Sequence, residues 1–159
     1  MELERWGRLV DRVGPPCWLS HTTAAELWGM DLCDVDPATH VTVGRARSRV
    51  RVPGLSVHRS DVPASHRELI GGLPVTSPVR TVADLARTCS HEAAVVAADS
   101  ALRSGALAAD ELAELTGAMG RGSGRIRAVV HASDRSESVL ETLARLLFRG
   151  HGLDPEVQR

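Results

Sequence analysis

The stretch GLPVTSPVRTVADLAR, from Gly72 to Arg87, constrains the fold most, because it predicts a strand that passes directly into a helix. Leu73 and Val75 alternate as in a short, half-buried strand. Ser77 followed by Pro78 marks a helix start, since the hydroxyl can accept a hydrogen bond from an unpaired backbone N–H and proline suits the first helical position. We therefore expect a sheet to meet its covering helices at this point.

The helix predicted from Pro78 to Arg87 has apolar residues at helical spacing on one side and charged residues on the others. Arg80 and Asp84 are four positions apart and can pair on an exposed face, where such a pair stabilises a helix by ~0.2 to 0.5 kcal/mol. Periodicity of this kind concerns packing, so we expect this helix to be scaffold without chemistry.

The same patterns predict an α+β fold, with a small, mostly antiparallel sheet within about residues 40–75 and a helical C-terminal half. Strands are expected at 40–43 and 55–58, in addition to the one before Ser77. The core must be aliphatic, because the 159 residues include one Phe, no Tyr and three Trp. The remaining helices are predicted at 2–13, 18–30, 91–104, 109–119, 126–131 and 137–149, the last of them capped by Ser133 or Ser136.

Charge is unevenly distributed along a chain whose formal net charge is −1. Residues 1–36 hold three Arg and seven acidic residues, whereas residues 37–80 hold seven Arg and two acidic residues, a local excess of +5. Within that segment, arginines recur at every second position: Arg45, Arg47, Arg49 and Arg51. If the segment is extended, the four guanidinium groups project to one side and could contact DNA phosphates. The alternative is a solvated hairpin loop.

Other kinds of site are not indicated by the sequence. Cys17, Cys33 and Cys89 have neither disulfide nor metal-ligand spacing, so we interpret them as small buried residues in a reducing compartment. The seven histidines are scattered singly, and His21 is interpreted as an ordinary residue at a helix terminus. No apolar signal core and no run of ~18 apolar residues is present, which predicts a cytoplasmic protein.

Several blocks in order resemble a known family: LSHTTAAELWGM, HVTVGRARSRVRVPGLSVHRSDVP, the opening stretch, EAAVVAADSALRSGALAADEL and ESVLETLARLLFRGHGLDPEVQ. They are similar to actinobacterial proteins that join an AbiEi-type antitoxin-like region to a Vsr-like endonuclease domain of the very-short-patch-repair type. The resemblance implies an antitoxin-like domain at 1–132 and the first helix of a nuclease-like domain at 133–159. It also implies that the winged helix and most of the nuclease domain are missing here.

In that nuclease domain, Glu137 and Glu141 match acidic positions of the first helix, which makes them weak catalytic candidates. A metal-dependent nuclease of this kind needs several converging carboxylates to hold Mg²⁺. Only eighteen residues follow Glu141, too few for the strands that would supply the rest. We therefore expect no cofactor in this chain, and Mg²⁺ only with a complete nuclease domain. The alternative is that Glu137 and Glu141 have no catalytic role and form an acidic first turn that complements the helix dipole.

Three functions remain open. The first is a non-catalytic, DNA-associated regulatory or interaction module of the AbiEi antitoxin type, involved in phage defence, with the arginine row as its DNA contact. The second is the N-terminal part of a truncated Vsr-like endonuclease. The third is a protein-binding antitoxin that neutralises a toxin partner.

Overall fold

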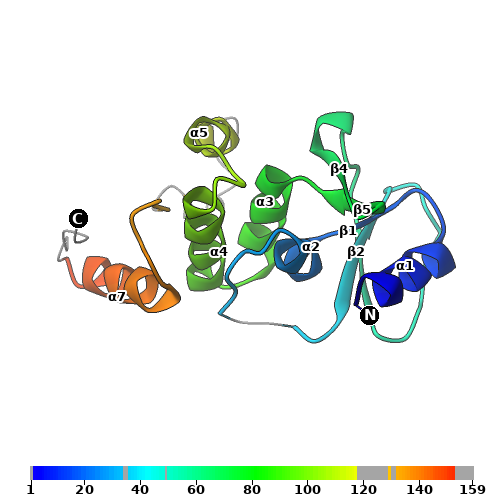
Figure 1. Ribbon diagram of the computed structural model, residues 1–159, viewed down its shortest axis with the longest axis horizontal. Helices are drawn as coiled ribbons and strands as arrows, with labels where there is room; N and C mark the ends of the chain where they lie inside the picture. Colours follow the sequence, from blue (N-terminus) through cyan, green and yellow to red (C-terminus); the bar gives the residue numbers. More distant parts are fainter. Residues whose placement is uncertain (1, 34–35, 49, 118–128, 130–131, 153–159) are drawn as a thin grey trace.

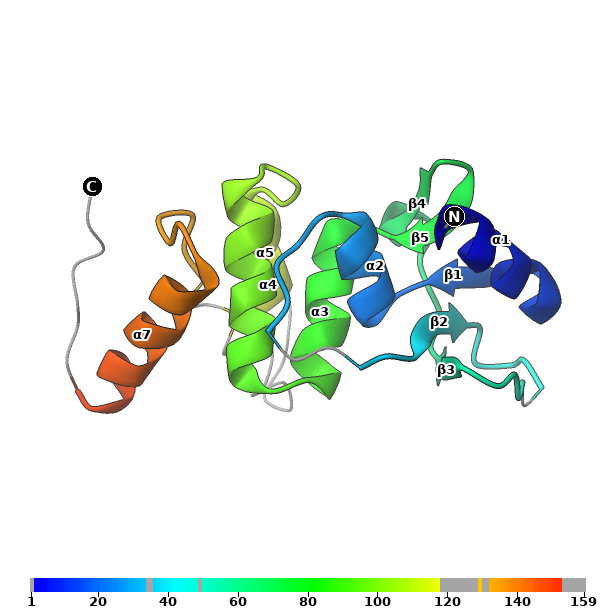
Figure 2. The ribbon, with the colours of Figure 1, turned by 60° about the horizontal axis from the view of Figure 1, so that its bottom comes forward.

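The protein is described here by a computed structural model that covers residues 2–33, 36–48, 50–117, 129 and 132–152. The predicted α+β class is confirmed: a five-stranded sheet lies at one end of the molecule, and helices continue from it in a row toward the other end (Figures 1 and 2). The helix predicted at 126–131 falls outside the described residues, except for Val129. In chain order the elements are α1 (Glu2–Val13), β1 (Cys17–Leu19), α2 (His21–Leu27), β2 (Thr39–Val43), β3 (Leu55–Arg59), the 3₁₀ turn η1 (Ala64–His66), β4 (Arg67–Ile70), β5 (Leu73–Thr76), α3 (Pro78–Thr88), α4 (His91–Arg103), α5 (Ala109–Gly117) and α7 (Val139–Gly150).

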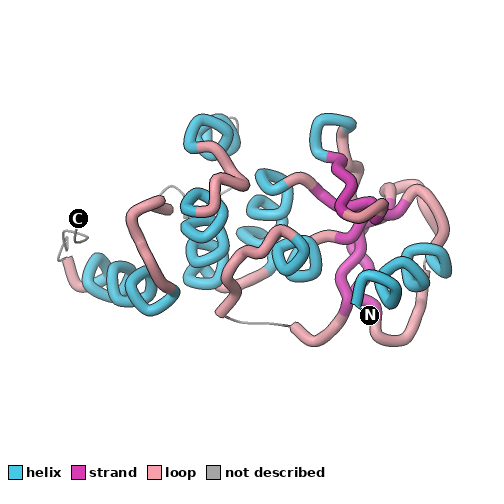
Figure 3. The backbone as a smooth tube through the Cα atoms, in the orientation of Figure 1, coloured by secondary structure: helices cyan, strands magenta, loops and turns pink. Residues whose placement is uncertain are grey.

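The sheet has the strand order β3-β2-β1-β5-β4 and is mixed, where mostly antiparallel pairing was expected. Figure 3 shows its strands, in magenta, gathered at the end of the molecule where the N-terminus lies. β1 pairs with β2 and β4 with β5 in antiparallel fashion, whereas β1 with β5 and β2 with β3 are parallel. β1 extends the sheet to residue 17, earlier in the chain than expected, and β4 is a strand that the sequence did not predict.

The parallel pairing of β2 and β3 also rules out a hairpin between them. A parallel pair requires a connection that crosses from one end of the strands to the other. Residues 44–54 make that connection, and among those described none is helical. As a result, β2 and β3 run side by side in register, with His40 opposite Ser56 and Thr42 opposite His58.

Serine caps place α3 and α4 where the sequence predicted them, whereas α2 begins at His21 rather than at residue 18 because residues 17–19 form β1. The Ser77 hydroxyl accepts a hydrogen bond from the Arg80 N–H at 3.4 Å at the start of α3, and the Ser90 hydroxyl accepts one from the Ala93 N–H at 3.2 Å at the start of α4. The cap of α7 is Ser138, so the prediction of Ser133 or Ser136 is wrong.

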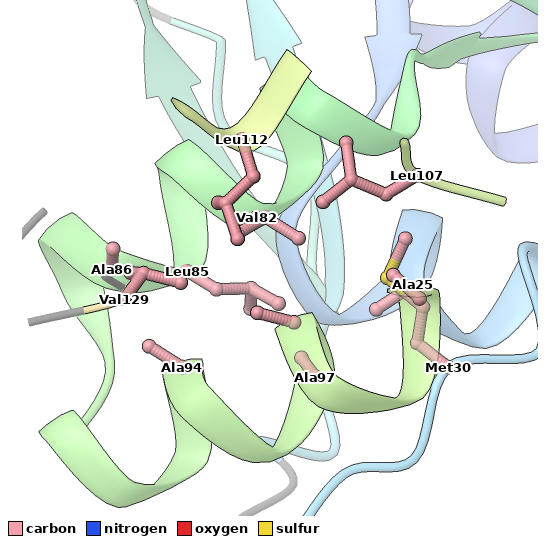
Figure 4. Packing of buried hydrophobic residues seen from close by; sticks show 12 residues of the cluster. Ala25, Met30, Val82, Leu85, Ala86, Ala94, Ala97, Leu107, Leu112 and Val129 are labelled. Carbon is pink, nitrogen blue, oxygen red and sulfur yellow. The ribbon is translucent and has the colours of Figure 1, made fainter. Parts of the chain in front are cut away.

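Two apolar clusters form the core of the described residues. One lies among α2, α3, α4 and α5 and consists of Ala, Val, Leu and Met side chains; Figure 4 shows Val82 and Leu85 of α3 facing Ala94 and Ala97 of α4. The other joins α1 to the sheet, where Trp6 and Val13 pack with Val41 and other strand residues. Within the described ranges, no helix combines the length and apolarity that crossing a membrane would need.

A buried ion pair ties α7 to α4. Arg145 Nη2 donates to Asp99 Oδ2 at 2.5 Å, and the Thr142 hydroxyl donates to the same oxygen at 2.6 Å. The other carboxylate oxygen accepts from the Ser133 N–H at 2.6 Å. The segment after residue 132, expected to begin a second domain, is thus anchored on the helices before it.

Candidate functional site

The arginine segment does not form the extended row on which the DNA prediction was based. The Arg47 N–H donates to the Gly44 carbonyl at 3.0 Å, which closes a turn directly after β2. Arg45 and Arg47 therefore sit in a turn and cannot project from one face of a strand. Arg49 lies outside the described residues, and Arg51 is exposed and outside any strand.

Two arginines hold this turn, which we call the arginine turn (residues 44–47), in place. The Arg47 guanidinium donates to the carbonyl of Gly14 at 2.5 Å and to that of Val13, the last residue of α1. From the end of β3, Arg59 Nη2 donates to the carbonyl of Arg45 at 2.7 Å and to that of Arg47. Because these guanidinium groups bind backbone carbonyls, Arg47 and Arg59 are structural here.

The turn consequently presents Arg45 to solvent. The Arg45 side chain is 76% exposed, and its partner Asp61, with 3.8 Å between Arg45 Nε and Asp61 Oδ2, is 75% exposed. An exposed ion pair of this kind contributes little stability, so Arg45 can exchange Asp61 for another anion. Among the described arginines of residues 44–54, Arg45 and Arg51 are the exposed ones.

The two acidic candidates at the start of α7 form a helix cap. The Ser138 hydroxyl accepts from the Glu141 N–H at 3.2 Å, and the Glu141 carboxylate accepts from the Glu137 N–H at 2.6 Å. This pair of hydrogen bonds resembles a capping box, except that the Glu141 carboxylate bonds the N–H of Glu137, one residue before the cap residue Ser138. Both side chains are exposed. Their catalytic role, and the expectation about Mg²⁺, stay predictions.

Arg80 and Asp84 of α3 are buried, so the expectation of an exposed pair is wrong. Their side chains are 8% and 6% exposed, and Arg80 Nε donates to both carboxylate oxygens at 2.9 Å. Arg80 also donates to the Asp61 carbonyl at 3.0 Å and to the Ser60 hydroxyl at 2.9 Å. The Arg80 side chain thereby fixes the loop after β3 against α3.

The structure brings three of the scattered histidines together beneath α2. His21 is the first residue of α2, His40 lies in β2 and His58 in β3. One ring nitrogen from each residue lies within 4.8 Å of the other two. His40 Nδ1 is 3.0 Å from His58 Nε2, and the rings of His21 and His58 are stacked with centroids 3.5 Å apart.

Polar groups surround this cluster, which we call the histidine cluster (His21, His40 and His58). His40 Nε2 lies 3.2 Å from Asp36 Oδ2. His21 Nδ1 lies 3.0 Å from the Ser20 hydroxyl oxygen, which accepts a 2.8 Å hydrogen bond from the Thr42 hydroxyl. The cluster is therefore embedded in a polar network rather than in the apolar core.

Burial keeps the three imidazoles neutral. It is the largest cause that lowers the pKa of His21 to about 2, and the neighbouring histidines and arginines lower this pKa further. Burial also lowers the pKa of His58 to about 4 and lowers that of His40, although Asp36 opposes the shift in both. Neutral imidazoles retain a lone pair, so the cluster can act as a hydrogen-bond acceptor or a ligand at neutral pH.

Sequence reasoning missed the histidine cluster because its members are 19 and 18 positions apart and follow no ligand spacing. One signal could have found two of them. His40 begins one predicted strand and His58 ends the other, and an antiparallel pairing of those strands would also have placed them close together. The third, His21, reaches the cluster through a left-handed backbone conformation with φ of 54°, which no local sequence pattern predicted.

Comparisons with known proteins identify the family. Two uncharacterized proteins, from two strains of Mycobacterium tuberculosis, are each 34% identical to this chain over 141 residues, which covers 86% of the chain. The chain spans about half the length of these curated relatives, and no solved structure gives a significant match. The family model of the AbiEi antitoxin C-terminal domain matches residues 19–131, a range that runs from β1 through α5 and includes the arginine turn and the histidine cluster. The chain therefore belongs to the AbiEi antitoxin C-terminal domain family.

Proposed function

We propose that the chain is a non-catalytic regulatory module of an antitoxin-type protein, and that it contacts duplex DNA through Arg45 and Arg51. The observation that carries the proposal is the arginine turn, whose backbone is held in place by side-chain hydrogen bonds. Arg47 and Arg59 hold the backbone through carbonyl contacts, while the neighbouring Arg45 side chain extends into solvent. A guanidinium held on a fixed turn loses less conformational entropy when it binds a phosphate.

Charge around the turn supports the same contact. Residues 37–80 carry an excess of +5, and among the described arginines of this range Arg80 pairs with a buried acid and faces inward. Phosphate contacts by arginine release counterions from DNA and need no base recognition. The proposed binding is therefore independent of sequence and sensitive to salt.

Fluorescence anisotropy of a labelled duplex at low salt tests the proposal. We expect saturable binding by the full chain and a several-fold weaker affinity for the double variant Arg45→Ala/Arg51→Ala. The variant Arg45→Lys/Arg51→Lys keeps both charges and is expected to retain most of the binding. Arg8→Ala removes an exposed arginine of α1 and serves as the matched control. Absence of wild-type binding, or equal losses in the control, would remove the DNA contact.

A protein-binding antitoxin is the second candidate, favoured by an apolar strip on α7. Leu140 is 78% exposed, Leu147 62% and Phe148 44%, and their spacing places them on one side of the helix. The opposite side carries Thr142 and Arg145, which contact Asp99 of α4. Exposed apolar side chains gathered on one helix face are typical of protein interaction sites. We assign this strip to a toxin protein as partner.

Co-expression tests this second candidate. The partner to use is a nucleotidyltransferase-like toxin, if one is encoded by the neighbouring gene. The wild-type chain should relieve toxicity and co-purify with the toxin, and Leu140→Gln/Leu147→Gln should do neither. Glu114→Gln, an exposed change on α5, is the control. A dimer of this chain that the double variant dissociates would instead assign the strip to self-association and contradict the toxin contact.

A further inference from the structure

We propose that His21, His40 and His58 bind a divalent transition-metal ion such as Zn²⁺ through one ring nitrogen each, with Asp36 orienting His40 from outside the coordination sphere. This site shares no residue with the arginine turn or with the exposed strip of α7. Neither the DNA contact nor the toxin contact depends on a bound metal ion, so each proposal can fail without affecting the others.

The fold itself brings the ligands together. In the parallel pair of β2 and β3, Thr42 is opposite His58, and residues two apart in a strand share a face, so His40 and His58 occupy neighbouring positions on the same face. That face lies under α2, whose first residue is His21. Three separate elements therefore each contribute one imidazole to the same place.

Distances within the cluster suit one ion. His40 Nδ1 and His58 Nε2 are 3.0 Å apart. Two nitrogens bound tetrahedrally to zinc at the usual bond length are separated by about 3.3 Å. The third ring is close enough to join them, since the ligand atoms all lie within 4.8 Å of one another. The His21 and His58 rings are stacked, so coordination requires a side-chain rotation of one ring out of the stack.

The groups around the cluster select the ligand atoms. Asp36 Oδ2 lies 3.2 Å from His40 Nε2, which favours a proton on Nε2 and leaves the Nδ1 lone pair directed at His58. Ser20 contacts His21 at Nδ1, so Nε2 of that ring is the atom left for a ligand. Carboxylate and hydroxyl partners of this kind fix the tautomer and orientation of metal-binding histidines.

The donor set indicates the class of ion. Three imidazoles without a carboxylate in direct reach suit Zn²⁺, Cu²⁺, Ni²⁺ or Co²⁺ rather than Mg²⁺ or Ca²⁺, which prefer oxygen ligands. Burial lowers the pKa of all three histidines, so each offers a lone pair at neutral pH. Asp36 also lines a surface pocket with Thr22 and Thr39, the sequence neighbours of His21 and His40.

Equilibrium dialysis of the untagged, EDTA-treated full chain against Zn²⁺, with metal content measured by mass spectrometry, tests the proposal. We expect one Zn²⁺ per chain in the wild type and in the control His91→Gln, which changes an exposed histidine. His58→Gln and His40→Gln should bind at least about tenfold more weakly, and Asp36→Asn about 10 to 100-fold more weakly.

Two further measurements keep the test independent of folding. Circular dichroism in EDTA establishes that each variant is folded, and His58 lies half-buried on an edge strand, where replacement is most readily tolerated. Co²⁺ added to the wild type should give the visible absorption of a tetrahedral site with nitrogen ligands. Absence of saturable Zn²⁺ binding, a purely octahedral Co²⁺ spectrum, or wild-type affinity in folded His58→Gln would overturn the metal site. Wild-type affinity in Asp36→Asn would overturn the role of Asp36.

Discussion

Replacing Asp84 by Asn distinguishes the buried network of α3 from the exposed helix pair that the sequence predicts. On an exposed face the change would cost ~0.2 to 0.5 kcal/mol of unfolding free energy. In the structure, Arg80 would be left with an uncompensated charge while 8% exposed. Removing one partner of a buried pair typically costs about 3 to 5 kcal/mol.

The structure places Asp84→Asn near the lower end of that range. Arg80 keeps two other acceptors, the Asp61 carbonyl and the Ser60 hydroxyl, and the new amide oxygen can still accept from Arg80 Nε. Arg87, the second cation beside Asp84, is 45% exposed and can turn to solvent. We therefore expect a loss of about 3 kcal/mol.

Urea unfolding followed by tryptophan fluorescence measures this loss, with Glu114→Gln as an exposed control expected to change stability by about 0.5 kcal/mol or less. The double variant Arg80→Met/Asp84→Asn completes the comparison. Burial raises the pKa of Asp84 even though Arg80 and Arg87 oppose it, so the pair does not fully offset its desolvation. Removing both charges should thus cost less than the sum of the single changes. A loss below about 1 kcal/mol for Asp84→Asn, or additive single losses, would refute a buried, coupled pair.

Two further predictions concern stability. In EDTA, the unfolding free energy should fall as the pH is lowered from 7.5 to 5, because unfolded histidines bind protons below 6.5 while His21, with its pKa lowered to about 2, stays neutral when folded. His21 alone contributes roughly 2 kcal/mol of this loss, and the raised pKa of Asp84 acts in the opposite direction. Stability that is constant over this range would contradict the burial of the cluster. Ser77→Ala should lower the unfolding free energy by about 1 kcal/mol in thermal or urea unfolding, because the α3 cap is lost. Ser77→Gly should lower it by only about a few tenths of a kcal/mol. Equal stability of Ser77→Ala and wild type would argue against the cap.

Local signals predicted the helices well because their information lies within a few residues. Glu2–Val13 was predicted at its observed bounds, and the Ser77 and Ser90 caps fixed where α3 and α4 begin. β1 was missed because Cys17–Leu19 is too short to show alternation. β4 was missed because Arg67–Ile70 is an edge strand with largely exposed side chains, so no apolar pattern marks it.

The candidate sites depend on contacts between distant segments, which the sequence does not encode locally. Arg80 is buried because its acceptors come from residues 60 and 61, brought over α3 by the chain that follows β3. Arg47 leaves the predicted row because the end of α1 offers carbonyls to its guanidinium. The histidine cluster forms because the pairing of β2 and β3 sets His58 opposite Thr42, next to His40, and because His21 begins the helix that follows β1.

The salt dependence of duplex binding tests the central claim most directly. Each arginine that neutralises a phosphate adds ~0.9 to the slope of log K against log salt concentration, so Arg45 and Arg51 together should account for about 1.8 of it. We expect Arg45→Ala/Arg51→Ala to have a shallower slope by about that amount, and Arg45→Lys/Arg51→Lys to keep the wild-type slope. An unchanged slope in the alanine variant would contradict a DNA contact through the arginine turn.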